Sequence, residues 1–107
     1  MSNYEDMAPR ELRERLDSGE APLLLDVREG WEFDISRIEG SRHIPMGEIS
    51  GRVSELEPEA EVVVICHHGA RSAHVADALS RFGFERVFNL AGGLDAYSDV
   101  DPGVRKY

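Results

Sequence analysis

Residues 62–72 read VVVICHHGARS, and this stretch decides the fold. Residues 62–65 form an unbroken run of β-branched apolar side chains, which is typical of a strand buried on both faces. From residue 72 to residue 82 apolar residues recur at helical spacing, and Gly83 ends the predicted helix. The apolar face of this helix is expected to carry Val75, Leu79 and Phe82. A buried strand that continues into an amphipathic helix is the building unit of a parallel α/β sheet.

Similar patterns on both sides of this stretch predict further elements. Strands are predicted at residues 23–27, 42–45 and 87–90. Helices are predicted at residues 11–16, 29–35, 49–56 and 94–97, with Pro9 in the first turn of the first helix. Because residues 23–27 are nearly all apolar, this strand is expected at the centre of the sheet. The alternation of strands and helices predicts an α/β fold with a mostly parallel sheet.

The whole chain, residues 1–107, is expected to form one soluble domain, because this length supports a single hydrophobic core. No apolar run approaches the roughly 18 residues of a membrane span. The net charge of −9 repels phosphate backbones and anionic lipids, so neither nucleic acid nor a membrane is expected as a partner. An acidic surface without an evident apolar stripe favours a monomer.

The only cysteine, Cys66, indicates a reducing compartment, because it can form neither an internal disulfide nor a multi-cysteine metal site. Residues 1–10 are polar and acidic, unlike a secretory signal or a transit peptide. A cytoplasmic location is therefore expected. Neither a metal nor a cofactor is predicted, since adjacent histidines on a loop rarely converge on a metal without further ligands.

Cys66 lies between the end of a predicted strand and the start of a predicted helix, where parallel α/β sheets bind ligands. The positive end of the helix and a nearby cation favour the thiolate, which is the nucleophilic form of cysteine. Gly69 can adopt backbone conformations closed to other residues, so several N–H groups of the loop can turn inward. The stretch is predicted to form a small anion-binding cradle around the sulfur. Its predicted binding residues are His67, His68, Gly69, Ala70 and Arg71.

Structural interpretations compete with this one. A lone cysteine is more often a packed core residue than a nucleophile, and Arg71 could be a solvated side chain in the first turn of the helix. Asp26 and Arg28 end another strand and are expected to tie loops together rather than to bind substrate. Residues 92–93, Gly-Gly, are expected to form a tight turn from strand to helix rather than a phosphate loop.

The stretch from Cys66 to Arg71, followed by Ser72, resembles the six-residue active-site loop of rhodanese domains. Residues 25–29 (LDVRE) with 32–33 (EF), residues 38–45 (IEGSRHIP) and residues 88–97 (FNLAGGLDAY) are similar to further signatures of that family, in the family's order. The resemblance implies a five-stranded parallel sheet flanked by helices on both faces. Ser36-Arg37, where the family usually has Gly-His, and Tyr97, where it commonly has tryptophan, depart from the pattern and concern local packing.

The resemblance also implies a sulfurtransferase in which Cys66 alternates between thiol and persulfide. The donor would be thiosulfate or a persulfide, and the acceptor an outside thiol such as thioredoxin or glutathione. The N–H groups of residues 67–71 would stabilise the persulfide anion, and Arg71 would hold the loop or bind the donor. Because His67 and His68 carry only partial positive charge at neutral pH, anionic donors are expected to bind better in mild acid.

Two other functions remain open. Cysteine phosphatases and arsenate reductases also use a cysteine loop closed by arginine, but they need five residues between the two, whereas Cys66 and Arg71 are separated by four. The second alternative is a non-catalytic module that binds proteins, or a persulfide carrier that a partner loads. Such modules often lose the cysteine, which is present here.

Overall fold

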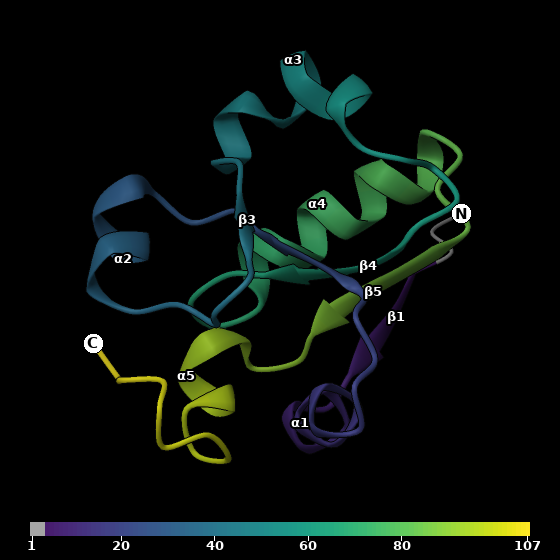
Figure 1. The fold of residues 1–107 in the computed structure, drawn as a ribbon. Coiled ribbons are helices and arrows are strands. Elements are labelled where there is room, and N and C mark those ends of the chain that lie inside the picture. Colours follow the sequence, from purple (N-terminus) through teal and green to yellow (C-terminus); the bar gives the residue numbers. More distant parts are fainter. Residues whose placement is uncertain (1–3) are drawn as a thin grey trace.

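The computed structural model describes residues 4–107, which form an open parallel sheet of five strands (Figure 1). The strands are β1 (Tyr4–Met7), β2 (Leu23–Asp26), β3 (Arg42–His43), β4 (Glu61–Ile65) and β5 (Arg86–Leu90). Their order across the sheet is β1-β5-β4-β2-β3, and every neighbouring pair is parallel. The predicted fold class is confirmed.

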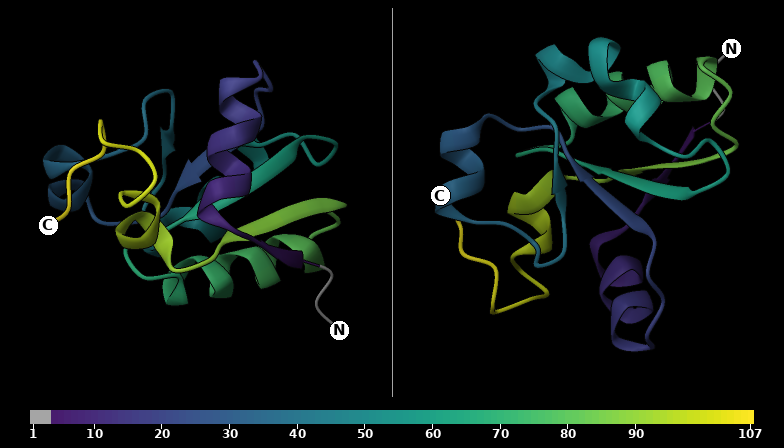
Figure 2. Two further views of the ribbon diagram at one scale, coloured as in Figure 1. Left: turned by 90° about the horizontal axis from the view of Figure 1, so that it is seen from below. Right: turned by 45° about the horizontal axis from the view of Figure 1, so that its top comes forward.

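Helices cover both faces of the sheet (Figure 2). They are α1 (Pro9–Asp17), α2 (Gly30–Ile35), α3 (Ile49–Arg52), α4 (Ala70–Arg81) and α5 (Gly93–Tyr97). The core layer under α1 and α5 contains Leu12, Leu94 and Tyr97, and the layer under α3 and α4 contains Ile49, Val75 and Leu79. In Figure 1, α2 stands beyond the edge of the sheet where the strands end.

β4 occupies the centre of the sheet and supplies both core layers. Val62 and Val64 belong to the layer under α4, and Val63 and Ile65 belong to the layer under α1 and α5. All four are fully buried, and each such side chain stabilises the fold by roughly 1.5–3 kcal/mol. Cys66 follows β4 directly and lies on the side of the sheet that α4 covers. The loop therefore starts at the end of the central strand.

Two predictions about the sheet need correction. β2 is an interior strand but not the central one, because β4 lies in the middle of the order. β1 is an additional edge strand that the hydrophobic pattern does not predict. Its Glu5 and Asp6 are exposed and only Met7 is fully buried, so the segment has the polar composition of a loop.

Two predictions about helices were also wrong. The helix expected over residues 49–56 is a single α-helical turn, α3, between 3₁₀ turns at Met46–Glu48 and Val53–Glu55. Gly51 lies in the middle of this segment, and glycine disfavours a continuous helix. Phe82 does not lie on the buried face of α4, since it follows the last turn and is 56% exposed, whereas Phe84 enters the core in its place.

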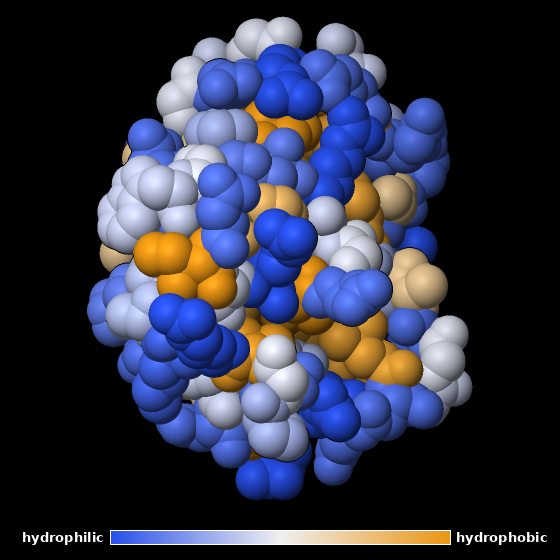
Figure 3. Space-filling view, turned by 60° about the vertical axis from the view of Figure 1, so that its left-hand side comes forward, coloured by the Kyte–Doolittle hydropathy of each residue, from blue (hydrophilic) through white to orange (hydrophobic). Residues whose placement is uncertain are grey.

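The face of the molecule in Figure 3 is mainly hydrophilic, with separate apolar patches. Figure 3 shows the side on which α2 and the C-terminus lie, where hydrophobic residues are interrupted by hydrophilic ones. The exposed large apolar side chains are Trp31, Ile35, Met46 and Phe82. Within residues 4–107, no helix has the length and apolar character needed to cross a membrane.

Candidate active site

The predicted nucleophile lies at the switch point of the sheet. The chain leaves β2 toward β3 at one edge and leaves β4 toward β5 in the other direction, and ligands of open α/β sheets bind at such a point. Asp26 ends β2, and Cys66 follows the last residue of β4. The structure therefore places the cysteine loop where the two connections diverge.

The loop holds the Cys66 sulfur against the backbone N–H of Gly69. The N–H of Gly69 donates to Sγ at 3.0 Å, and Gly69 has a φ of 102°, a conformation that favours glycine. α4 begins at Ala70, so Ala70 and Arg71 already belong to its first turn, whose N–H groups have no partner within the helix. Cys66 itself is 1% exposed. Of the loop N–H groups predicted to surround the sulfur, that of Gly69 is the one seen to donate to Sγ among the described residues.

The turn of residues 92–93 fixes the start of the loop through two backbone hydrogen bonds. The N–H of Leu94 donates to the carbonyl of Cys66 at 2.8 Å, and that of Asp95 donates to the carbonyl of His67 at 3.0 Å. Gly93 has a φ of 65°, and a Cβ on it would lie 2.4 Å from the His67 carbonyl oxygen. The predicted tight turn is confirmed, and it leaves no room for a side chain at Gly93.

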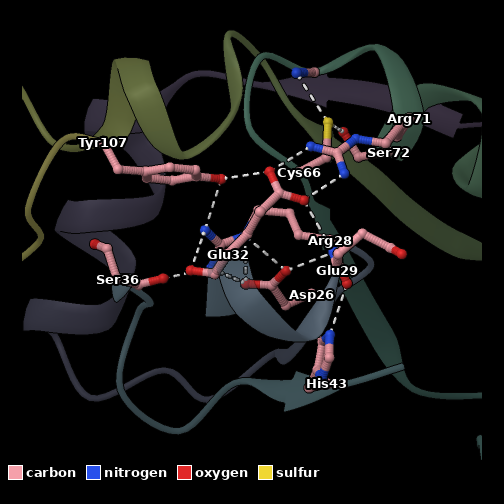
Figure 4. Close-up of polar contacts among 11 residues, drawn as sticks. Asp26, Arg28, Glu29, Glu32, Ser36, His43, Cys66, Arg71, Ser72 and Tyr107 are labelled. Atoms are coloured by element: carbon pink, nitrogen blue, oxygen red, sulfur yellow. Dashed lines mark hydrogen bonds and ion pairs between the residues drawn. The ribbon is translucent and has the colours of Figure 1, made fainter. Parts of the chain in front are cut away.

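Arg71 is fixed by a carboxylate from another part of the chain. Its two terminal nitrogens lie 2.6 and 2.8 Å from the two carboxylate oxygens of Glu32 in α2 (Figure 4). This bidentate pair raises the pKa of Arg71 and engages one N–H of each terminal nitrogen. Of the roles expected for Arg71, the geometry favours holding the loop over a solvated side chain or direct binding of a donor.

Glu32 connects the loop to α2 and to the C-terminal segment. It is 4% exposed, and it also accepts hydrogen bonds from the N–H of Glu29 and from the hydroxyl of Tyr107 at 2.9 and 2.8 Å. Arg71 lowers the pKa of Glu32 to about 2, and these two donors add to the effect although burial opposes it. Glu32 is therefore ionised at neutral pH and keeps Arg71 in place.

This contact predicts a specific loss of stability in acid. Because the folded-state pKa of Glu32 is about 2 and its ordinary value is 4.5, its stabilisation is complete above the ordinary value and is lost as pH falls through 2. The free energy of unfolding should fall by roughly 3 kcal/mol over this interval. Urea denaturation at a series of pH values measures it. Glu32→Gln should flatten the plot of unfolding free energy against pH. Glu57→Gln, which changes an exposed carboxylate, should not flatten it. Equal plots for the two variants would contradict the assignment to Glu32.

Asp26 and Arg28 form a fully buried ion pair beside this network (Figure 4). The Nε and Nη2 atoms of Arg28 donate to the Asp26 carboxylate at 2.9 and 2.8 Å. Nη1 of Arg28 donates to the carbonyl of Glu32 and to the hydroxyl of Tyr107, and Nη2 also donates to the carbonyl of Ser36. Burial alone would lower the pKa of Arg28, but Asp26 and Tyr107 raise it. The expectation that this pair ties segments together is confirmed.

The two histidines of the loop lie in a stack of rings. The His67 ring lies between those of His68 and Tyr107, with centroids 4.0 and 4.1 Å away. Burial and the neighbouring His68 lower the pKa of His67, so it is neutral at pH 7. His68 is exposed, with Nδ1 4.0 Å from the Asp95 carboxylate. Within the loop, His67 thus contributes less positive charge than the sequence suggests, and any gain in donor binding from its protonation moves to lower pH.

Sequence reasoning missed three residues of this site: Glu32, Ser72 and Tyr107. Ser72 places its hydroxyl 3.2 Å from the Cys66 sulfur. Glu32 carried one local signal, since Glu29 and Glu32 have the spacing of a capping box, which the structure contains. No local pattern indicates that Glu32 meets Arg71 or Tyr107, because these contacts join residues 39 and 75 positions apart.

The fold and the loop define an α/β protein with a single cysteine, held by the Gly69 N–H, at the switch point of a parallel sheet. The family model for the Rhodanese-like domain matches residues 8–99. The chain belongs to the rhodanese-like domain family.

Relatives of the chain carry names that concern sulfur. It is 36% identical over 93 residues to the "Putative sulfur carrier protein YrkF" of Bacillus subtilis, a match that covers 87% of this chain and 50% of that protein. The chain thus spans half of this relative's length. It is 29% identical over 99 residues to "Thiosulfate sulfurtransferase GlpE" of Pseudomonas aeruginosa, covering 92% of this chain and 88% of that one.

Solved structures show the same fold. The crystal structure of a rhodanese-related protein from Thermoplasma volcanium superposes with a TM-score of 0.84 at 31% sequence identity. The match covers 97% of this chain and all of that one. The five-stranded sheet with its helices is therefore the shared architecture.

Proposed function

We propose that this chain is a sulfurtransferase that moves a sulfane sulfur from a small donor, thiosulfate or a persulfide, to a thiol acceptor. The observation that carries the proposal is the Cys66 sulfur, which accepts the Gly69 N–H at the start of α4. A sulfur atom held there meets N–H donors and the positive end of a 12-residue helix, both of which stabilise a negative charge. The names of the relatives agree with this chemistry.

The reaction would proceed in two displacements at sulfur. The Cys66 thiolate attacks the outer sulfur of thiosulfate, a new S–S bond forms, and sulfite leaves with the electron pair of the old bond. The acceptor thiolate then attacks the outer sulfur of the Cys66 persulfide, and the Cys66 thiolate leaves. Since the chain has one cysteine, the acceptor must be another molecule, such as thioredoxin or glutathione.

The length of the loop supports sulfur over phosphate. Four residues separate Cys66 from Arg71, and both terminal nitrogens of Arg71 are already bonded to Glu32. A phosphatase or arsenate reductase would need a wider cradle, with five residues between the cysteine and the arginine. Hydrolysis of an aryl phosphate that Cys66→Ser abolishes would overturn this choice.

A persulfide carrier loaded by a partner protein is the second candidate. One relative is named a sulfur carrier, and Cys66 is 1% exposed, which suits transfer within a docked complex. The two functions differ in turnover. An enzyme forms many equivalents of product from thiosulfate and a small acceptor, whereas a partner-fed carrier forms none from thiosulfate but accepts sulfur from a protein persulfide.

The decisive experiment is to incubate the protein with thiosulfate and to measure its intact mass. We expect a gain of one sulfur atom, reversed by glutathione and absent in Cys66→Ala. Continuous release of sulfite with an added thiol would support the enzyme. No mass gain with thiosulfate, with a small persulfide or with a protein persulfide would contradict sulfur transfer through Cys66.

A further inference from the structure

A line of hydrogen bonds runs from Cys66 to the edge strand β1. The Cys66 sulfur lies 3.2 Å from the Ser72 hydroxyl oxygen, and that hydroxyl lies 2.5 Å from Oδ1 of Asn89 (the Cys66 and Ser72 side chains are in Figure 4). Nδ2 of Asn89 donates to the carboxylate of Asp6 at 3.0 Å. Asp6 and Asn89 are direct partners in the register of β1 and β5, so the sheet itself places them side by side.

The donor and acceptor atoms of these side chains determine which group donates in each hydrogen bond. An ionised carboxylate only accepts, so Asp6 holds the amide nitrogen of Asn89 and turns the amide oxygen toward Ser72. The oxygen of an amide also only accepts, so the Ser72 hydroxyl donates its one hydrogen to Asn89. What Ser72 presents to the Cys66 sulfur is therefore a lone pair.

A lone pair at this position distinguishes the two forms of Cys66. The neutral thiol can donate its hydrogen to Ser72, whereas the thiolate faces a second acceptor. To stabilise the thiolate, Ser72 would have to turn its hydrogen away from Asn89, and Asn89 would have to reverse its amide against Asp6. The Gly69 N–H acts in the opposite direction, because it donates to the sulfur in either form, and the charge of the Arg71 guanidinium also favours the thiolate.

We propose that Asp6 is a positioning residue that, through Asn89 and Ser72, turns a lone pair of the Ser72 hydroxyl toward Cys66 and so lowers the reactivity of Cys66 with electrophiles. Asp6 does not contact the sulfur, and it lies outside the residues 8–99 matched by the family model. The inference rests on the proposed role of Cys66 as nucleophile. Its test uses alkylation, in which the thiolate displaces iodide, so the result is independent of sulfur transfer.

The experiment measures the rate of alkylation of Cys66 by iodoacetamide across a range of pH, followed by intact mass. In Asp6→Ala the amide of Asn89 is free to reverse, and Ser72 can donate to the thiolate. A hydrogen bond to a charged group of this kind should raise the rate about tenfold on the rising, lower-pH limb of the profile. The high-pH plateau, where Cys66 is thiolate in both proteins, should not change. Loosening of the loop would raise the plateau as well, and that result would overturn the proposal.

Two further comparisons separate the hydrogen-bond line from a simple effect of charge. Glu5→Ala removes the neighbouring exposed carboxylate of β1 and should leave the profile unchanged. Ser72→Ala removes only the hydroxyl, and in this background Asp6→Ala should have no effect on the lower-pH limb, because the line is already broken. If Asp6→Ala accelerates alkylation equally with and without Ser72, or if Glu5→Ala matches it, the proposed coupling is wrong.

Discussion

The Gly93→Ala variant is expected to lose roughly 3–5 kcal/mol of stability and to be loaded poorly with sulfur. A Cβ at this position would lie 2.4 Å from the carbonyl oxygen of His67 and 2.6 Å from that of Cys66, both parts of the backbone. Alanine would also have to keep a φ of 65°. Backbone strain of this kind costs about 1–3 kcal/mol, and each of the two hydrogen bonds that would separate contributes about 1 kcal/mol.

The effect on activity follows from the same contacts. The hydrogen bonds from Leu94 and Asp95 hold the carbonyls of Cys66 and His67, so moving the turn moves the start of the loop. Urea denaturation gives the stability, and the mass gain with thiosulfate gives the loading. Gly51→Ala is the matched control, because Gly51 lies in a helix with open space around it and should be neutral or slightly stabilised. If the two variants were equally stable and equally loaded, the turn would not position the loop.

Much of the fold was predictable because local and global requirements coincide in the middle of the sheet. Val62 to Val64 must be apolar on both faces, and the pattern of residues 62–65 directly predicts a buried strand, although the centre of the sheet was predicted at residues 23–27 instead. At the edge this coincidence fails. β1 needs one fully buried side chain, Met7, and its exposed Glu5 and Asp6 resemble a loop. An edge strand is stabilised by hydrogen bonds to the neighbouring strand, and no local sequence pattern indicates this pairing.

The residues of the site were likewise predictable only where they lie close together in the sequence. The nucleophile, the glycine and the arginine of the loop are close in sequence, so Cys66, Gly69 and Arg71 were recognisable together. Their supports come from distant segments: Glu32 from α2 and Tyr107 from the C-terminal segment. The sequence also suggested a more positive loop than the structure has, because the burial of His67, which lowers its pKa, depends on the tertiary stack of rings.

Asp26→Ala is expected to destabilise the fold by about 3–5 kcal/mol, because it leaves the guanidinium of Arg28 buried without its counter-ion. Arg28 and Asp26 are both fully buried, and Asp26 accepts hydrogen bonds from the side-chain Nε and Nη2 and from the backbone N–H of Arg28. The carbonyls and the hydroxyl that Arg28 also contacts are neutral acceptors, and they do not replace a charge. The measurement is the free energy of unfolding from urea denaturation at neutral pH.

Two controls show whether the unpaired charge is the cause. Asp77→Ala removes a partly exposed i,i+4 partner of the exposed Arg81 on α4, and such surface pairs contribute only about 0.2–1 kcal/mol. The double variant Asp26→Leu, Arg28→Met removes both charges and keeps apolar volume, so it should be more stable than Asp26→Ala alone. It should still be loaded less well with sulfur, because Arg28 holds the carbonyl of Glu32 and the hydroxyl of Tyr107, and Glu32 fixes Arg71. A double variant as unstable as Asp26→Ala would mean that the shape of the pair, and not its charge balance, holds this end of the sheet together.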